Sequence, residues 1–85
     1  MPEIVIYTKP FCPYCERAMA LLNRKGAAFT EIVASIDADK RQEMRERSGR
    51  TTYPQIFIGE KHIGGSDELQ SFEAEGKLDP LLAAV

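Results

Sequence analysis

The sequence predicts an α/β fold in which helices flank a four-stranded mixed sheet, in the order β-α-β-α-β-β-α. Short β-branched stretches alternate with longer stretches of helical spacing. The early strand, helix, strand order implies a right-handed crossover and a parallel pair of strands. Later, residues 55–58 and 61–63 read as strands joined by a turn at Gly59-Glu60. This hairpin must add antiparallel strands to the same sheet.

The first half of the chain is expected to form a strand, a helix and a second strand. Residues 3–8 are mostly β-branched or aromatic, which is typical of a buried strand. Pro13 interrupts this segment, and residues 14–25 then have helical spacing until Gly26 provides a stop signal. Residues 29–33 form a shorter and more mixed strand. The apolar face of the helix consists of Cys15, Ala18, Met19 and Leu22.

A second, charged helix is expected to run to about Ser48. Asp37 or Asp39 can cap its beginning, and Gly49 can end it. Its apolar face is weak and consists mainly of Met44, so it should be the most solvated element. Two ion pairs at helical spacing would each add a few tenths of a kcal/mol. These pairs are Asp37 with Arg41 and Glu43 with Arg47.

A third helix is expected after the hairpin, opening at Ser66 or Asp67 and ending near Gly76. Residues 78–84 add a last helical turn or two. We find no internal repeat, low-complexity tract or linker in the sequence. The whole chain, residues 1–85, is therefore expected to be a single domain.

The composition narrows the classes of function. A chain of 85 residues with 44% apolar residues has a thin core, so a shallow surface site is more plausible than a deep cavity. The net charge of −2 argues against a dedicated nucleic-acid binder. Apolar runs fall far short of the ~18 residues that a transmembrane helix requires. No secretory signal is visible, and we expect a cytoplasmic protein.

The two cysteines, Cys12 and Cys15, lie where an expected strand ends and a helix begins. Unpaired N–H groups of the first helical turn and the helix dipole stabilise negative charge, so Cys12 is expected to react as a thiolate. Cys15 lies one helical turn further on, faces the core and can attack a disulfide formed on Cys12. This arrangement favours thiol–disulfide exchange.

Three other interpretations of the cysteines stay open. The pair could be two small buried hydrophobes, since free cysteine is often buried. A structural zinc normally needs four ligands, and beyond the two thiols the chain offers only His62 and carboxylates. An iron–sulfur cluster shared between two chains is the strongest of the three. The strand-end and helix-start context nevertheless favours redox exchange, with no metal expected.

Four blocks of sequence resemble the dithiol glutaredoxins, and the resemblance covers essentially the whole chain. These blocks are Tyr7-Thr8-Lys9, Cys12-Pro13-Tyr14-Cys15, residues 51–58 (TTYPQIFI) and residues 62–67 (HIGGSD). The resemblance implies a thioredoxin-like fold and a monomer that reduces disulfide-containing and glutathionylated proteins. Glutathione would be the co-substrate, kept reduced by glutathione reductase and NADPH. Cys12 would be the nucleophile and Cys15 the resolving thiol.

The resemblance also implies a glutathione site. Lys9 would meet the glycine-end carboxylate, and Arg41 would supply a second positive charge. Ser66 and Asp67 lie at a helix N-terminus, whose N–H groups suit the γ-glutamyl carboxylate. The Asp67 side chain would pair with the α-ammonium. The other expected glutathione contacts are Tyr14, Thr52, Tyr53, Pro54 and Gly65.

By the same resemblance, the Tyr53–Pro54 peptide bond is expected to be cis and to expose the Tyr53 backbone to an extended cysteine-containing peptide. The sequence departs from the family at two points. Tyr53 stands where the family often has valine, and its side chain could narrow or extend the groove. Ser66 stands where some relatives have cysteine, which removes a third thiol. His62 is expected to be a structural or surface residue.

Two alternative functions are weighed against this one. A donor fed by thioredoxin reductase would not need a site for peptide carboxylates, and Lys9, Tyr14 and Asp67 speak against it. An iron–sulfur carrier would be a binding module, usually dimeric, that resembles the monothiol members of the family. Pro13 stiffens the loop against a cluster, and Cys15 offers an internal disulfide instead.

Overall fold

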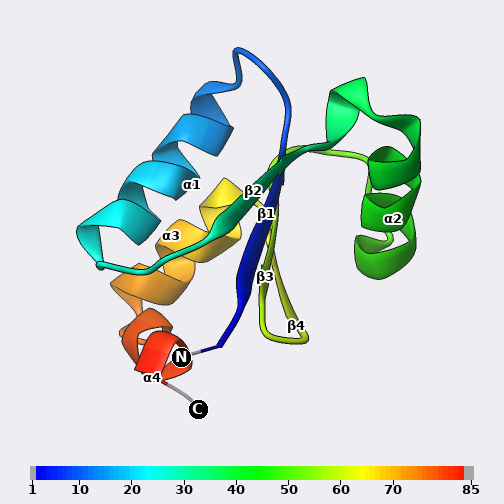
Figure 1. Ribbon diagram of the computed structural model, residues 1–85. Helices are drawn as coiled ribbons and strands as arrows, with labels where there is room; N and C mark the ends of the chain where they lie inside the picture. The colour runs from blue at the N-terminus through cyan, green and yellow to red at the C-terminus, as the bar shows by residue number, and fades with distance from the viewer. Residues whose placement is uncertain (1, 84–85) are drawn as a thin grey trace.

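A strand with partners on both sides is the centre of the fold, and the computed structural model describes residues 2–83. Strand β1 (Ile4–Thr8) pairs in parallel with β2 (Thr30–Val33) and antiparallel with β3 (Gln55–Ile58). Strand β4 (Lys61–Gly64) pairs with β3 as a hairpin, which gives the order β2-β1-β3-β4. The predicted four-stranded mixed sheet is confirmed (Figure 1). Every residue of β1 is buried, as expected for a strand covered on both faces.

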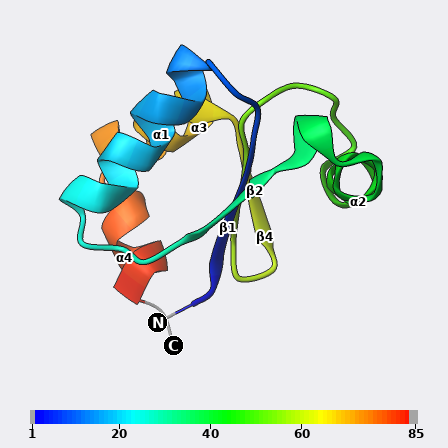
Figure 2. The same cartoon turned by 45° about the horizontal axis from the view of Figure 1, so that its top comes forward.

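Helices cover both faces of this sheet, as Figures 1 and 2 show. Helices α1 (Pro13–Arg24), α3 (Ser66–Ala74) and the short α4 (Leu78–Ala83) gather on one face, while α2 (Ala38–Ser48) stands alone on the other. A 3-10 turn, η1 (Ala34–Ile36), leads from β2 into α2. The arrangement is the expected thioredoxin-like fold. The predicted end of the last helix, Ala84, lies outside the described residues.

The larger apolar core fills the space between the sheet and the group of three helices. Side chains alternate along a strand, so Ile4 and Ile6 of β1 point into this core. On α1, Leu21 is fully buried, whereas Met19, predicted on the apolar face of the helix, is partly buried and packs against this core. The buried stripe of α1 is centred on Leu21 and its neighbours, so Met19 lies at the rim. The helices contribute Ala18, Leu21, Leu22, Leu69, Leu78 and Leu82.

The smaller apolar core lies under α2 and contains the opposite side chains of the central strands. It consists of Val5, Tyr7, Ala34, Met44 and Phe57. Met44 is the one buried residue of α2, as the sequence predicted. The rings of Tyr7 and Phe57 meet edge to face, with 5.8 Å between their centroids. Apolar contact therefore holds α2 less firmly than the helices on the other face.

The hydroxyl of Tyr7 provides a second attachment for α2. It donates a hydrogen bond to the Glu43 carboxylate and accepts one of 2.9 Å from Arg47 Nη1. The Arg47 guanidinium also lies 4.1 Å from the centroid of the Phe57 ring. The predicted Glu43–Arg47 ion pair does not form among residues 2–83. Both side chains turn instead to the buried hydroxyl, which needs hydrogen-bond partners.

The predicted Asp37–Arg41 pair is also wrong, and the reason lies at the start of α2. Asp37 is the N-cap, and its carboxylate accepts from the backbone N–H groups of Asp39 and Lys40. Arg41 Nη1 donates to the carbonyl oxygen of Ser35 at 2.7 Å. Each side chain therefore satisfies backbone groups at the junction between η1 and α2.

The ends of the helices follow the expected signals. Gly49 has the left-handed φ of 70° that a helix C-terminus favours, and Gly26 has a φ of 68° just after α1. No helix among the described residues has the length and apolar character needed to cross a membrane.

Candidate active site

The sulfur of Cys12 caps the first turn of α1. Cys12 is the N-cap residue with extended backbone angles, and Pro13 follows it in the first turn, where no N–H is needed. The Cys15 N–H points at Cys12 Sγ over a distance of 3.3 Å. The N–H groups at a helix start favour a negative charge on this sulfur. Phe11, just before it, is fully exposed and has a positive φ of 57°, a strained conformation for a large side chain.

Both cysteines are free thiols, and both are buried. Cys12 is 3% exposed and Cys15, on the buried side of α1, is 1% exposed. Burial, and next the hydrogen bond with Cys12, raises the pKa of the Cys15 thiol to about 12. Cys15 is therefore protonated at neutral pH.

A shallow groove of about 190 Å³ begins at Tyr14, which stands between the two cysteines in the sequence; neither cysteine itself lines it. Tyr14 from the first turn of α1 forms one wall, the loop that leads into β3 forms a second, and the start of α3 forms a third. The Tyr53–Pro54 peptide bond in this loop is cis, as expected. The groove is lined by Tyr14, Arg50, Thr52, Tyr53, Pro54, Gly65, Ser66, Asp67 and Glu68. Seven of these residues are among the glutathione contacts proposed from the sequence.

The start of α3 has an unused hydrogen-bonding group in the groove. Gly65 is the N-cap residue and has no side chain with which to cap the helix. Ser66 is 3% exposed, and its hydroxyl has no hydrogen-bond partner among the described residues. A buried hydroxyl beside free N–H groups of a helix start suits a carboxylate. This end of the groove can therefore bind an anion.

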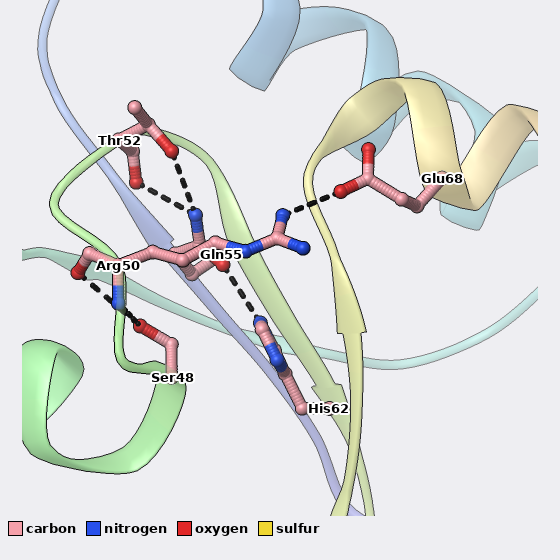
Figure 3. A network of polar contacts seen from close by, with 6 residues as sticks. All are labelled: Ser48, Arg50, Thr52, Gln55, His62 and Glu68. Carbon is pink, nitrogen blue, oxygen red and sulfur yellow. Dashed lines mark hydrogen bonds and ion pairs between the residues drawn. The ribbon is translucent and has the colours of Figure 1, made fainter.

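Arg50 and Glu68 add a pair of opposite charges to the groove (Figure 3). Arg50 Nη1 and Glu68 Oε1 form an ion pair that joins the loop to α3. The bond with Arg50 is the main cause that lowers the pKa of the Glu68 carboxyl, and burial opposes it. The sequence analysis missed both residues, although Arg50 lies two positions before Thr52 and Glu68 directly follows Asp67.

A chain of hydrogen bonds, from His62 through the buried Gln55 to Thr52, supports the Thr52 wall of the groove (Figure 3). We call this chain the relay. The Gln55 amide nitrogen donates to the carbonyl and to the hydroxyl oxygen of Thr52, both at 3.0 Å. Because Gln55 uses its nitrogen in this way, its oxygen accepts from His62 Nε2 at 2.7 Å. Burial, and next the charge of Arg50, lowers the pKa of His62, so the imidazole is neutral at neutral pH. His62 therefore has the structural place expected for it.

Three proposed residues lie differently from the rest. Lys9 is exposed in the loop before Cys12, and Arg41 is bound to the Ser35 carbonyl; neither lines the groove. Tyr53 lines the groove, but it also packs against the smaller core, and its buried hydroxyl has no partner within residues 2–83. No group of three His, Cys, Asp or Glu side chains that could hold a metal ion is found in the described part of the chain.

Comparison with known proteins gives consistent results. The sequence model of the glutaredoxin family matches residues 4–63. Glutaredoxin 3 of Escherichia coli is 57% identical over 82 residues, which cover 96% of this chain and 99% of that protein. A solution structure of glutaredoxin from Brucella melitensis shares 62% identity with a TM-score of 0.84, covering 96% of this chain and 89% of that one. A buckwheat glutaredoxin–glutathione complex shares 33% identity with a TM-score of 0.85, covering 95% and 76%.

The fold and the paired thiols at a helix start define a thiol–disulfide oxidoreductase of the thioredoxin-like class. The family model and the 57% identity to a glutaredoxin over 96% of the chain identify the family, and the protein belongs to the glutaredoxins.

Proposed function

We propose that this protein uses glutathione to reduce protein–glutathione mixed disulfides and protein disulfides. The observation that carries the proposal is the groove that extends from Tyr14 of the Cys-Pro-Tyr-Cys motif to the start of α3, where the buried Ser66 hydroxyl has no partner among the described residues. Glutathione carries two carboxylates and one ammonium, so its site needs both signs of charge. Asp67 at the same end of the groove is suited to the ammonium. The buckwheat glutaredoxin, whose crystal structure is a complex with glutathione, supports this assignment.

Reduction of a mixed disulfide needs only Cys12. Its thiolate attacks the glutathione sulfur, the target leaves as a thiolate, and a Cys12–glutathione disulfide forms. A second glutathione, as thiolate, attacks the glutathione sulfur bound to Cys12. This step releases oxidised glutathione and restores the Cys12 thiolate. Glutathione reductase then transfers two electrons from NADPH, which returns oxidised glutathione to two molecules of glutathione.

Reduction of a protein disulfide uses Cys15 as well. Cys12 forms a disulfide with the target, and Cys15 gives up its proton and attacks the Cys12 sulfur. The target leaves fully reduced, and the protein holds a Cys12–Cys15 disulfide that two glutathione molecules reduce. Because the Cys15 thiol has a pKa of about 12 before reaction, it is a weak competitor of glutathione at Cys12.

The surroundings of the reaction follow from this chemistry. We propose a monomer in the cytoplasm, where glutathione and NADPH keep thiols reduced. Lys9 and Arg41 lie outside the groove, and we keep only Lys9, in the loop that precedes Cys12, as a contact for the glycine-end carboxylate.

NADPH consumption with glutathione, glutathione reductase and a small glutathione mixed disulfide tests the proposal. We expect rapid turnover by the wild type and none by Cys12→Ser, because the serine hydroxyl cannot replace the thiolate. Circular dichroism checks that both proteins are folded. A folded wild type that does not turn over would show that the groove is not a glutathione site.

A further inference from the structure

The side chain of Arg50 crosses the groove from the loop to α3 (Figure 3). Its backbone is fixed, because the N–H of Arg50 donates to Ser48 Oγ at 3.0 Å. Ser48 Oγ in turn donates to the carbonyl of Met44 at 2.7 Å. The guanidinium reaches the carboxylate of Glu68. Arg50 is thus a positive charge held in the groove by an anchored backbone at one end and a carboxylate at the other.

Glu68 presents a carboxylate to Arg50 from the start of α3. It belongs to the first turn of α3, and its Oε1 lies 2.5 Å from where a Cβ on Gly64 would stand. Backbone N–H groups of Gly65 and of Glu68 itself help Arg50 to keep the carboxylate ionised, which shows as a lowered pKa. Glu68 is therefore an internal anion between a guanidinium and a helix start, the same two partners that suit a ligand carboxylate.

We infer that Arg50 is a specificity-determining residue that binds the α-carboxylate of the γ-glutamyl end of glutathione, and that Glu68 is the internal carboxylate which this ligand displaces. The inference rests on the proposed function and names the contact that selects one end of the ligand. The side chains of Arg50 and Glu68 are 47% and 39% exposed. An ion pair so exposed to water contributes little to stability, so exchanging its anion costs little.

The charges around Arg50 indicate which end of glutathione lies there. Glu68 pairs with the guanidinium, and Asp67 adds a second carboxylate to the same groove in the first turn of α3. The glycine end of glutathione carries only a negative charge, which these carboxylates would repel. The γ-glutamyl end carries a carboxylate and an ammonium on the same carbon. Arg50 can bind the first while Asp67 binds the second, so both charges of this end of the ligand are paired, and the displaced Glu68 carboxylate turns to the solvent.

Two mixed-disulfide probes test the inference. One joins glutathione to 2-mercaptoethanol, and the other is identical except that a primary amide replaces the γ-glutamyl α-carboxylate. We expect Arg50→Gln to lower kcat/KM about tenfold for the first probe, as for the loss of one charged hydrogen bond. For the amide probe, we expect Arg50→Gln to change kcat/KM by less than about twofold, because this probe offers no carboxylate to the wild-type guanidinium and the variant therefore loses no charged contact with it.

Glu68→Gln and Arg17→Gln are the matched variants. Glu68→Gln removes the internal competitor, so we expect kcat/KM for the carboxylate probe to rise about two- to threefold. A purely structural ion pair would instead make Arg50→Gln and Glu68→Gln lose activity together, and that result would overturn the inference. Arg17 lies over the ring of Tyr14 and does not line the groove. Arg17→Gln therefore measures the loss of a nearby positive charge together with its contact to Tyr14, and an equal effect of Arg17→Gln and Arg50→Gln would also overturn the inference.

A binding measurement separates this inference from the proposed function. On a Cys15→Ser background, the fraction of protein glutathionylated in a glutathione redox buffer can be read by mass spectrometry. We expect Arg50→Gln to shift the equilibrium constant about tenfold against the Cys12–glutathione disulfide. No shift overturns the role of Arg50 alone, provided that the wild type turns over the carboxylate probe. No turnover by a folded wild type overturns the proposed function and the role of Arg50 with it.

Discussion

Replacing Gln55 with methionine should destabilise the protein through the relay below the groove. Gln55 is fully buried and makes three side-chain hydrogen bonds, two to Thr52 and one to His62. Methionine has nearly the same length and shape, so no large cavity forms. The substitution removes all three hydrogen bonds, and the partner atoms of Thr52 and His62 lose the side chain that they bond to. At about 1 kcal/mol for each bond, we expect a loss of about 2–3 kcal/mol in the free energy of unfolding.

Urea denaturation followed by circular dichroism measures this loss. For a domain of this size, the slope of the free energy against urea is about 1 kcal/mol/M, so the midpoint should fall by about 2–3 M. Gln42→Met is the matched control, because Gln42 is exposed and bonds only to Glu46 among the described residues. We expect the control to change the free energy of unfolding by less than about 0.5 kcal/mol.

The same variant should also affect the site. Thr52 lines the groove and loses its two bonds from Gln55, so we expect KM for a glutathione mixed disulfide to rise with little change in kcat. If Gln55→Met matches Gln42→Met in both stability and KM, the relay does not position Thr52, and our reasoning about it is wrong.

Two further predictions concern Cys15 and His62. Cys15→Ser should keep most of the activity toward glutathione mixed disulfides and lose activity toward protein disulfides, because the high pKa of about 12 keeps Cys15 out of the first reaction; equal loss toward both substrates in the NADPH assay would contradict this. Burial lowers the pKa of His62 in the folded state below its ordinary value of 6.5. Below about pH 6.5, the unfolded chain therefore binds a proton at His62 more readily than the folded protein does, and this proton stabilises the unfolded state. The free energy of unfolding should therefore be constant just above pH 6.5 and fall as the pH drops below it, and His62→Gln should remove this slope in urea titrations between about pH 7 and 5. A slope that survives the substitution would assign the effect to other groups.

Much of the fold follows from local sequence signals, because these act between near neighbours. The Pro13 at a helix start, Gly49 at a helix end and the β-branched run of β1 each leave few alternatives. The errors arose where tertiary contacts compete with local ones. Glu43 and Arg47 are at ion-pair spacing on a helix, but the hydroxyl of Tyr7, 36 residues before Glu43 in the sequence, takes both.

The candidate site shows the same division. Tyr14, Thr52 and Asp67 lie in motifs, and the structure brings them together in one groove. Arg50 and Glu68 are separated by 18 residues, and no periodic pattern connects them. Only the sheet, by placing the loop before β3 next to the start of α3, shows that they meet.

The capping role of Cys12 links the redox state of the protein to its conformational stability. The Cys15 N–H points at Cys12 Sγ, so the reacting sulfur also completes the first turn of α1. A thiolate is a better acceptor than a disulfide sulfur, and every turnover therefore weakens and restores a helix cap. Folding and oxidation form a thermodynamic cycle. The free energy by which the reduced protein is more stable to unfolding than the oxidised protein must therefore equal the free energy by which the disulfide is easier to reduce in the folded protein than in the unfolded chain. Any substitution that improves this cap would make the protein a stronger oxidant and a weaker reductant by the same free energy.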